Sequence, residues 1–124
     1  MRLEEAINQF MQPKLRNRLY PYVLPQKPVL PAVVYNSVSI ERVHALQKDT
    51  GFVKHRLQFS TYAKTAKQAT ETASIIRAEL SDFSGDMAGL SIGGVLLISE
   101  VTDYEKDTDL YSVKVEFEFQ YEEG

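Results

Sequence analysis

The stretch that decides the fold is Leu110–Glu122, which reads Leu-Tyr-Ser-Val-Lys-Val-Glu-Phe-Glu-Phe-Gln-Tyr-Glu. Apolar and polar side chains alternate along it. The apolar ones stand at the odd positions, Tyr111, Val113, Val115, Phe117, Phe119 and Tyr121. Because successive side chains of a strand point to opposite faces, this pattern predicts an amphipathic antiparallel strand with one covered and one open face. The other elements must then supply the cover.

Composition narrows the class of protein. The chain has 124 residues, of which 44% are hydrophobic and 25% charged, so we expect one globular domain spanning residues 1–124. The net charge of −3 argues against a phosphate-gripping surface, and the lack of cysteine excludes disulfides and thiolate chemistry. Two acids lie near the N-terminus, where a signal peptide would have an apolar run, so no signal peptide is predicted. No apolar run reaches the roughly 18–20 residues that a membrane span needs, so no span is predicted either.

The N-terminal quarter divides into a helix and an arm. Residues 1–12 show helical spacing of their apolar side chains, and a second short turn follows at Lys14–Tyr20. All five prolines lie between positions 13 and 31, which rules out a regular helix or a central strand there. We predict a Pro-rich extended arm that leads into the sheet.

Four strands and two loops account for most of the remainder. The strands are predicted at Ala32–Ile40, Phe52–Tyr62, Val95–Tyr104 and Leu110–Glu122. The polar stretch Glu41–Gly51 and the glycine-rich stretch Ser84–Gly94 are predicted as loops, and Glu105–Asp109 as a turn. The continuous apolar run Val95–Ile98 predicts a strand covered on both faces at that end.

The main helix is predicted over Thr65–Phe83. Thr65 is placed to cap it, with Gln68 three residues on in a capping box. An apolar stripe rich in alanine lets this helix approach the sheet closely. Together, the predicted helices and strands indicate an α+β fold, a four-stranded antiparallel sheet with two helices packed on one face.

No constellation of residues predicts catalysis, a metal or a cofactor. His44 and His55 have no partner at a metal-ligand spacing, and both are interpreted as structural or surface residues. The alternating acids of Asp103–Asp109 lack the glycine and closing glutamate of a calcium loop. The glycines match no dinucleotide fingerprint, and no Gly-x-Ser-x-Gly elbow occurs. The chain is therefore not expected to be an enzyme.

The projecting segments are the candidates for contacts with other chains. Either they find partners in an oligomer or they are simple mobile loops, and the residues alone leave both open. The interface candidates are Arg16, Arg18, Tyr20, Tyr22, Arg42, His44, Lys48, Asp49, Met87, Glu116 and Glu118. A solvated face is the alternative for the two arginines, and plain exposure to solvent for the two glutamates.

Four landmarks carry a family resemblance. They are Leu19-Tyr-Pro-Tyr-Val23, Leu30-Pro-Ala-Val-Val-Tyr35, Leu57-Gln-Phe-Ser-Thr-Tyr-Ala63 and Asp109-Leu-Tyr111, the last opening the terminal strand. With the leading helix, they resemble the tail-completion, or tail-to-head joining, family of long-tailed bacteriophages and prophages, which is similar to tail terminators. The resemblance covers nearly the whole chain.

The resemblance implies a structural virion protein with no catalytic residues. Such proteins cap the head-proximal end of the tail tube as a ring, commonly a hexamer. The implied partners are further copies of the chain, the tail tube protein, and the head connector or a head-completion protein. DNA would pass through the lumen without sequence-specific binding, with Glu116 and Glu118 facing either that lumen or solvent. The implied location is the head–tail interface of the virion, and the host cytoplasm during assembly. The residues alone leave an alternative, a small ligand-binding or regulatory α+β domain with a pocket between sheet and helix.

Overall fold

The computed structural model describes residues 3–44 and 49–122 of the chain. Its elements, in chain order, are α1 (Leu3–Met11), the 3-10 helix η1 (Pro13–Leu15), β1 (Leu19–Pro21), β2 (Ala32–His44), β3 (Asp49–Ala63), α2 (Ala66–Leu80), β4 (Gly85–Met87), β5 (Leu90–Glu105) and β6 (Leu110–Glu122). Neither helix is long and apolar enough to cross a membrane, within the part of the chain described.

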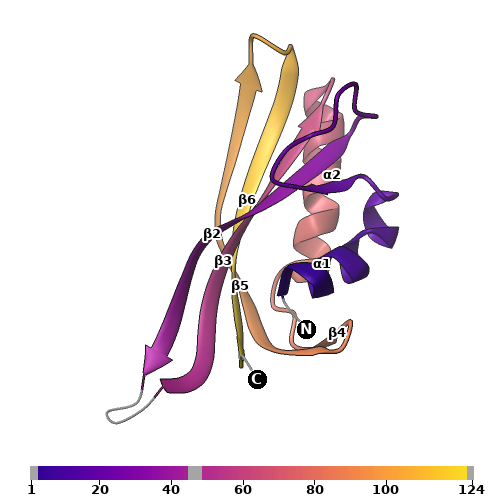
Figure 1. Cartoon of the computed structure of the whole chain (residues 1–124). Helices are drawn as coiled ribbons and strands as arrows, with labels where there is room; N and C mark the ends of the chain where they lie inside the picture. The colour runs from indigo at the N-terminus through magenta and orange to yellow at the C-terminus, as the bar shows by residue number, and fades with distance from the viewer. Residues whose placement is uncertain (1–2, 45–48, 123–124) are drawn as a thin grey trace.

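The strands form one curled, six-stranded sheet in the order β1-β2-β3-β6-β5-β4 (Figure 1). Strand β1 pairs parallel with β2, and all other neighbours are antiparallel. The expected four-stranded antiparallel sheet is therefore wrong, and the fold is a mixed half-barrel that is mostly β. Register shifts in β2 after Ser37 and in β5 after Leu97 mark bulges, which increase local twist and bend a sheet.

The alternation that defines β6 is confirmed. Val113, Val115, Phe117, Phe119 and Tyr121 are buried in the core, whereas the acidic side chains between them are not. The ring of Phe117 lies between those of Phe59 and Phe119, at centroid distances of 5.9 and 6.4 Å with edge-on geometry. Edge-on pairs place the positive rim of one ring on the negative face of another, which favours this arrangement beyond simple burial. The predicted strand is thus the centre of the core.

Both helices lie on the same side of the sheet (Figure 1). The predicted N-cap is confirmed, since Thr65 Oγ1 accepts a hydrogen bond from the backbone N–H of Gln68 at 3.1 Å. Helix α2 ends at Leu80 and not at Phe83, because Ser81 is extended and Asp82 adopts a φ of 60°. Its buried alanines, Ala69 and Ala73, allow the close approach to the sheet that the sequence predicted.

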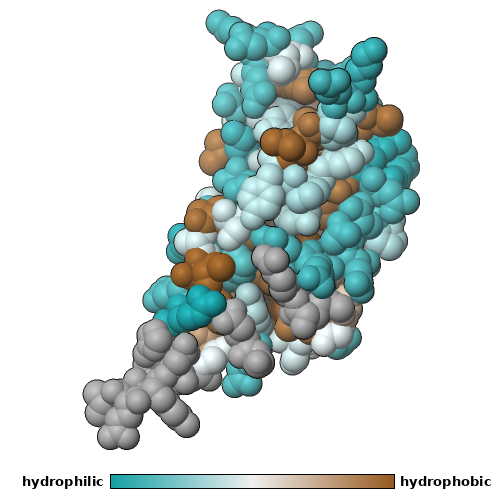
Figure 2. Space-filling model, viewed as in Figure 1, coloured by the Kyte–Doolittle hydropathy of each residue, from teal (hydrophilic) through white to brown (hydrophobic). Residues whose placement is uncertain are grey.

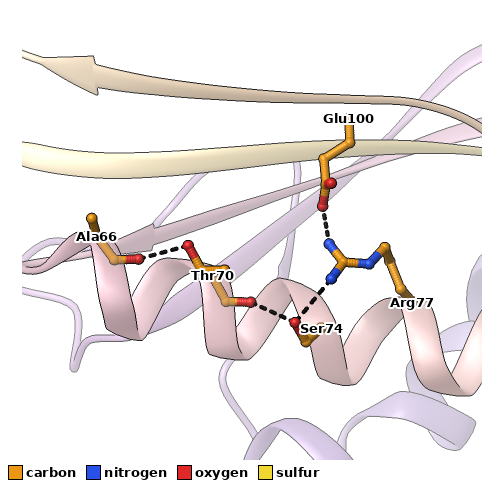
Figure 3. Close-up of polar contacts among 5 residues, drawn as sticks. All are labelled: Ala66, Thr70, Ser74, Arg77 and Glu100. Carbon is orange, nitrogen blue, oxygen red and sulfur yellow. Dashed lines mark hydrogen bonds and ion pairs between the residues drawn. The ribbon is translucent and has the colours of Figure 1, made fainter.

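A line of side-chain contacts ties α2 to β5 (Figure 3). Within the helix, Thr70 Oγ1 donates to the Ala66 carbonyl at 2.8 Å, and Ser74 Oγ donates to the Thr70 carbonyl at 3.0 Å. Arg77 donates to Ser74 Oγ at 2.9 Å and pairs with the carboxylate of Glu100 on β5. The ion pair thus links α2 to β5, whereas the main contacts of the helix are with β3 and β6.

Both predicted loops contain strand. Within Glu41–Gly51, β2 continues to His44 and β3 begins at Asp49, leaving only residues 45–48, which lie outside the described part. Within Ser84–Gly94 lie β4 and the start of β5. Polar residues form strand here because their backbones pair with the backbone of the neighbouring strand, as Glu41 of β2 pairs with Lys54 of β3. The arm also contributes β1, so it is not merely a connector.

Candidate assembly surface

The sheet face turned away from the helices carries a ladder of charged side chains. Arg56 on β3 stands between two carboxylates of β6, with Nη1 3.4 Å from Glu116 Oε2 and Nε 4.0 Å from Glu118 Oε1. The side chains of Glu116 and Glu118 are only 17% and 14% exposed. The two predicted acidic positions are thus present on this open face, but a guanidinium between them compensates part of their charge.

Strand β5 exposes a strip of large apolar side chains along one edge of the sheet. Leu96, Leu97, Ile98 and Val101 are 47%, 45%, 39% and 56% exposed. The prediction that this run is covered on both faces is wrong. Helix α2 packs over β3 and β6, and β4 pairs only with Leu90–Ile92. Within the described residues, no strand pairs with the outer edge of β5 from Leu96 to Glu105.

Strand β2 forms the opposite open edge. Strand β1 pairs with it only at Val33–Tyr35. No strand of the described chain pairs with its outer edge over Asn36–Glu41. Val38 and Ile40 are exposed there. The body therefore has two open edges, each bordered by exposed apolar side chains.

A cavity of about 240 Å³ lies between η1, the start of β2 and the outer side of α2. The basic residues on its wall are Lys14, Arg16 and Arg18, and Glu71 is the acid facing them. Arg18 Nη1 donates to the Leu30 carbonyl at 3.3 Å, while Lys14 Nζ is 4.0 Å from Glu79 Oε2. The structure thus brings together the two predicted arginines and adds Lys14, which the sequence interpretation did not include.

The two predicted tyrosines lie on β1 and just after it, and neither lines the cavity. Tyr20 is half-buried opposite Val34. Tyr22 is exposed and donates its hydroxyl hydrogen bond to Glu4 Oε1 at 3.0 Å. Burial, with smaller effects of Glu4 and Tyr22, raises the pKa of the Tyr35 phenol beside them.

The remaining predicted positions are dispersed. Arg42 is exposed on β2 opposite Val53. His44 and Asp49 face each other in the backbone register of the β2–β3 hairpin, and Lys48 lies outside the described residues. Met87 is fully buried in the core, so its side chain is out of reach of a second chain in this conformation. These residues do not form one site.

The second histidine is a core residue with hydrogen-bond partners. His55 Nε2 is 2.7 Å from Ser37 Oγ, and Nδ1 is 3.1 Å from the Tyr121 hydroxyl. Its ring is buried, as a satisfied structural histidine requires. Among residues 3–44 and 49–122, no group of three or more His, Asp or Glu side chains is arranged to hold a metal ion.

Two open sheet edges bordered by exposed apolar side chains are typical of a structural protein that assembles with other chains. The family model described as tail completion protein gp17 matches residues 6–122. Because this match spans nearly the whole chain, the chain belongs to the tail-completion family, and the resemblance seen in its sequence is confirmed. It is a structural phage tail protein, a component of the virion.

A solved structure has the same fold. A chain of the structure titled virion of native gene transfer agent (GTA) particle superposes with a TM-score of 0.70. The two chains are 14% identical, and the match covers 97% of this chain and 94% of that one. At this identity the likeness concerns the fold alone. No match was found among curated proteins.

Proposed function

We propose that copies of this chain form a ring, hexameric in the virion, that caps the head-proximal end of the tail tube and joins tail to head. Membership of the tail-completion family is the observation that carries the proposal. The partners are further copies, the tail tube protein, and the head connector or a head-completion protein. Assembly takes place in the host cytoplasm, and DNA passes through the lumen without sequence-specific binding.

The two open edges supply a route to the ring. In the sheet order β2-β3-β6-β5 each neighbour is antiparallel, so β2 and β5 run in opposite directions. Rotation about an axis along the strands preserves those directions, and the β2 edge of one copy then meets the β5 edge of the next as an antiparallel pair. Such a contact is heterologous, and it closes into a ring when the rotation closes.

This proposal is tested on the purified protein, alone and mixed with the tail tube protein. Native mass spectrometry is expected to find a closed oligomer of one size, and negative-stain images are expected to show rings at tube ends. Light scattering provides an independent mass. A protein that stays monomeric at every concentration, and binds neither tube nor connector, would exclude the ring.

A second prediction concerns the charged ladder of Arg56, Glu116 and Glu118 on the open face of the sheet. In the proposed ring we place this face toward the lumen. One guanidinium and two carboxylates give Arg56, Glu116 and Glu118 a summed charge of −1 per copy. Combining Glu116→Lys and Glu118→Lys with Arg56→Glu keeps opposite charges adjacent and reverses the sum to +1. We expect rings to form as before and DNA delivery to fall, because a cationic lumen retains phosphates.

Infectivity per assembled particle measures the effect. The control carries Glu5→Lys, which makes the same change of charge per copy at an exposed position of α1. Unchanged infectivity of the triple variant would place the ladder on an outer surface. The ligand-binding alternative is less well supported. The cavity of about 240 Å³ beside α2 is smaller than the roughly 300–1,000 Å³ of typical ligand sites. A second hollow of about 350 Å³ lies between α1 and β1, but most of the residues that line it are polar, whereas ligand sites are mainly apolar.

A further inference from the structure

We propose that the acidic β5–β6 turn, Glu105–Asp109, of one copy docks at the basic cavity beside α2 of the next copy. This inference rests on the proposed ring and names the segment and the site that meet in it. The occupant is a second copy of this chain. Three observations carry the inference: the opposite charges of the cavity and the turn, the order within the turn, and the end of the sheet at which both lie.

The cavity presents cations around an apolar floor. Leu15, Pro31 and Val33 contribute apolar surface, and Ile75 is an exposed apolar side chain on the α2 wall. Arg16 is exposed and has φ 54°, at the residue that ends η1. In the described part of the chain, no hydrogen bond or ion pair joins the Arg16 side chain to other residues. Its guanidinium is thus available to a carboxylate from outside.

The turn has the complementary charge. Its five residues hold three acids, Glu105, Asp107 and Asp109, against one lysine. In Figure 2 the upper end of the molecule, where Figure 1 shows this turn, is covered by hydrophilic surface. Opposite charges on the two surfaces favour encounter in one register and disfavour the contact of like surfaces.

The turn is held in shape before any contact forms. The Tyr104 hydroxyl donates to Asp109, and Thr108 Oγ1 donates to Glu105 Oε2 at 3.4 Å. The ring of Tyr104 packs on that of Tyr111 at a centroid distance of 4.9 Å. The hydrogen bond to Asp109 raises the pKa of the Tyr104 phenol above its ordinary value. An ordered turn loses less conformational entropy on docking than a flexible one.

Cavity and turn lie toward the same end of the sheet, on opposite halves of it. One row of paired residues crosses the sheet from Val33 on the cavity wall, through Thr61 and Val113, to Thr102, which lies shortly before the turn. Strands β3 and β6 lie between β2 and β5, so two strands separate the turn from its own cavity. A rotation about an axis along the strands brings the turn to the cavity end of the neighbouring copy without any shift along that axis, as a closed ring requires.

The pairing of β5 of one copy with β2 of the next, as proposed for the ring, also brings the turn toward the cavity. A neighbour's β5 can pair with β2 over Asn36–Glu41, but β1 occupies the edge of β2 at Val33–Tyr35. Beyond that point the neighbour's hairpin must pass outside β1. There it meets the segment from η1 to Arg18, which forms the cavity wall.

Disulfide trapping tests the contact directly, because the chain contains no cysteine. Gln68→Cys places a thiol on the exposed cavity wall, and Asp107→Cys places one on the turn. Mild oxidation of the assembled double variant is expected to give a ladder of linked multimers on a non-reducing gel, ending at the ring size. Each single variant can give at most a dimer. The matched control pair is Glu5→Cys with Asp107→Cys, and it should give no ladder.

A charge swap tests the chemistry. Arg16→Glu and Asp107→Arg are each expected to weaken self-association by about tenfold, and their combination to recover most of that loss. The control Lys64→Glu makes the same change of charge at an exposed position outside the cavity, and should leave association unchanged.

The outcomes separate this contact from the ring itself. Rings of normal size without a ladder from the Gln68/Asp107 pair would overturn the docking and leave the proposed function standing. Failure of the charge swap to recover association would also overturn it. A protein that is monomeric under all conditions, including with the tube protein, would remove the ring and the docking together.

Discussion

Replacing Phe117 with alanine is expected to lower the free energy of unfolding by about 3–5 kcal/mol. Its side chain is fully buried at the centre of β6, and its ring contacts those of Phe59 and Phe119. The substitution removes apolar surface and leaves a cavity that strands on both sides of β6 hold open, because close-packed interiors relax only partly. Domains of this size are typically stable by about 5–15 kcal/mol, so the variant is near the limit of folding.

Urea unfolding followed by circular dichroism measures the loss, since the chain contains no tryptophan. Phe117→Asp should fail to fold, because it buries a charge without a partner. The control is Glu118→Ala on the opposite face of the same strand, where loss of the contacts with Arg56 and Gln120 is expected to cost about 1–2 kcal/mol, well below the cost of the core substitution. Equal effects of the Phe117 and Glu118 substitutions would contradict the assignment of the two faces.

Replacing Leu96 and Val101 with lysine is expected to abolish ring assembly while the subunit still folds. Both side chains are exposed on β5, where substitutions change stability by only about 0.5 kcal/mol. In the proposed ring they are covered by the β2 edge of the neighbour. Losing about 1.5 kcal/mol of burial at each, or about 3 kcal/mol in total, weakens association by somewhat over a hundredfold. Lysine on an edge strand also opposes strand addition directly.

Native mass spectrometry and urea unfolding of the same preparation separate assembly from folding. The control variant carries Gln9→Lys and Ala78→Lys, which add the same charge at exposed positions of α1 and α2, away from both edges. Rings formed normally by the β5 variant would exclude this edge as the contact between copies.

The sequence predicted some elements well because their signals are local. The alternation of Leu110–Glu122 identified the central strand and its buried face, and Thr65 identified the start of α2. The sequence predicts Arg16 and Arg18 as contact residues, and the structure places both on one cavity wall. Their role in contact remains a prediction.

Other features carry no local signal. The run Val95–Ile98 looks the same whether both faces are covered or the strand lies at an edge, and the edge position became evident only from the extent of β4. The polar residues after Ile40 have the composition of a loop and nevertheless form strand, because β3 pairs with them. The glycine-rich stretch around Met87 predicts a surface loop, but β4 folds back onto β5 and buries this side chain.

The open face of Leu110–Glu122 shows the same division. The sequence by itself determined that Glu116 and Glu118 stand opposite a buried aromatic face, because the period of two is a property of the strand backbone. Only the tertiary structure decided that Arg56 lies between them and that β2 and β5 are left as open edges. Those facts depend on which strands pair and where each pairing stops. Such long-range contacts are decided by packing of the whole core and not by the order of neighbouring residues.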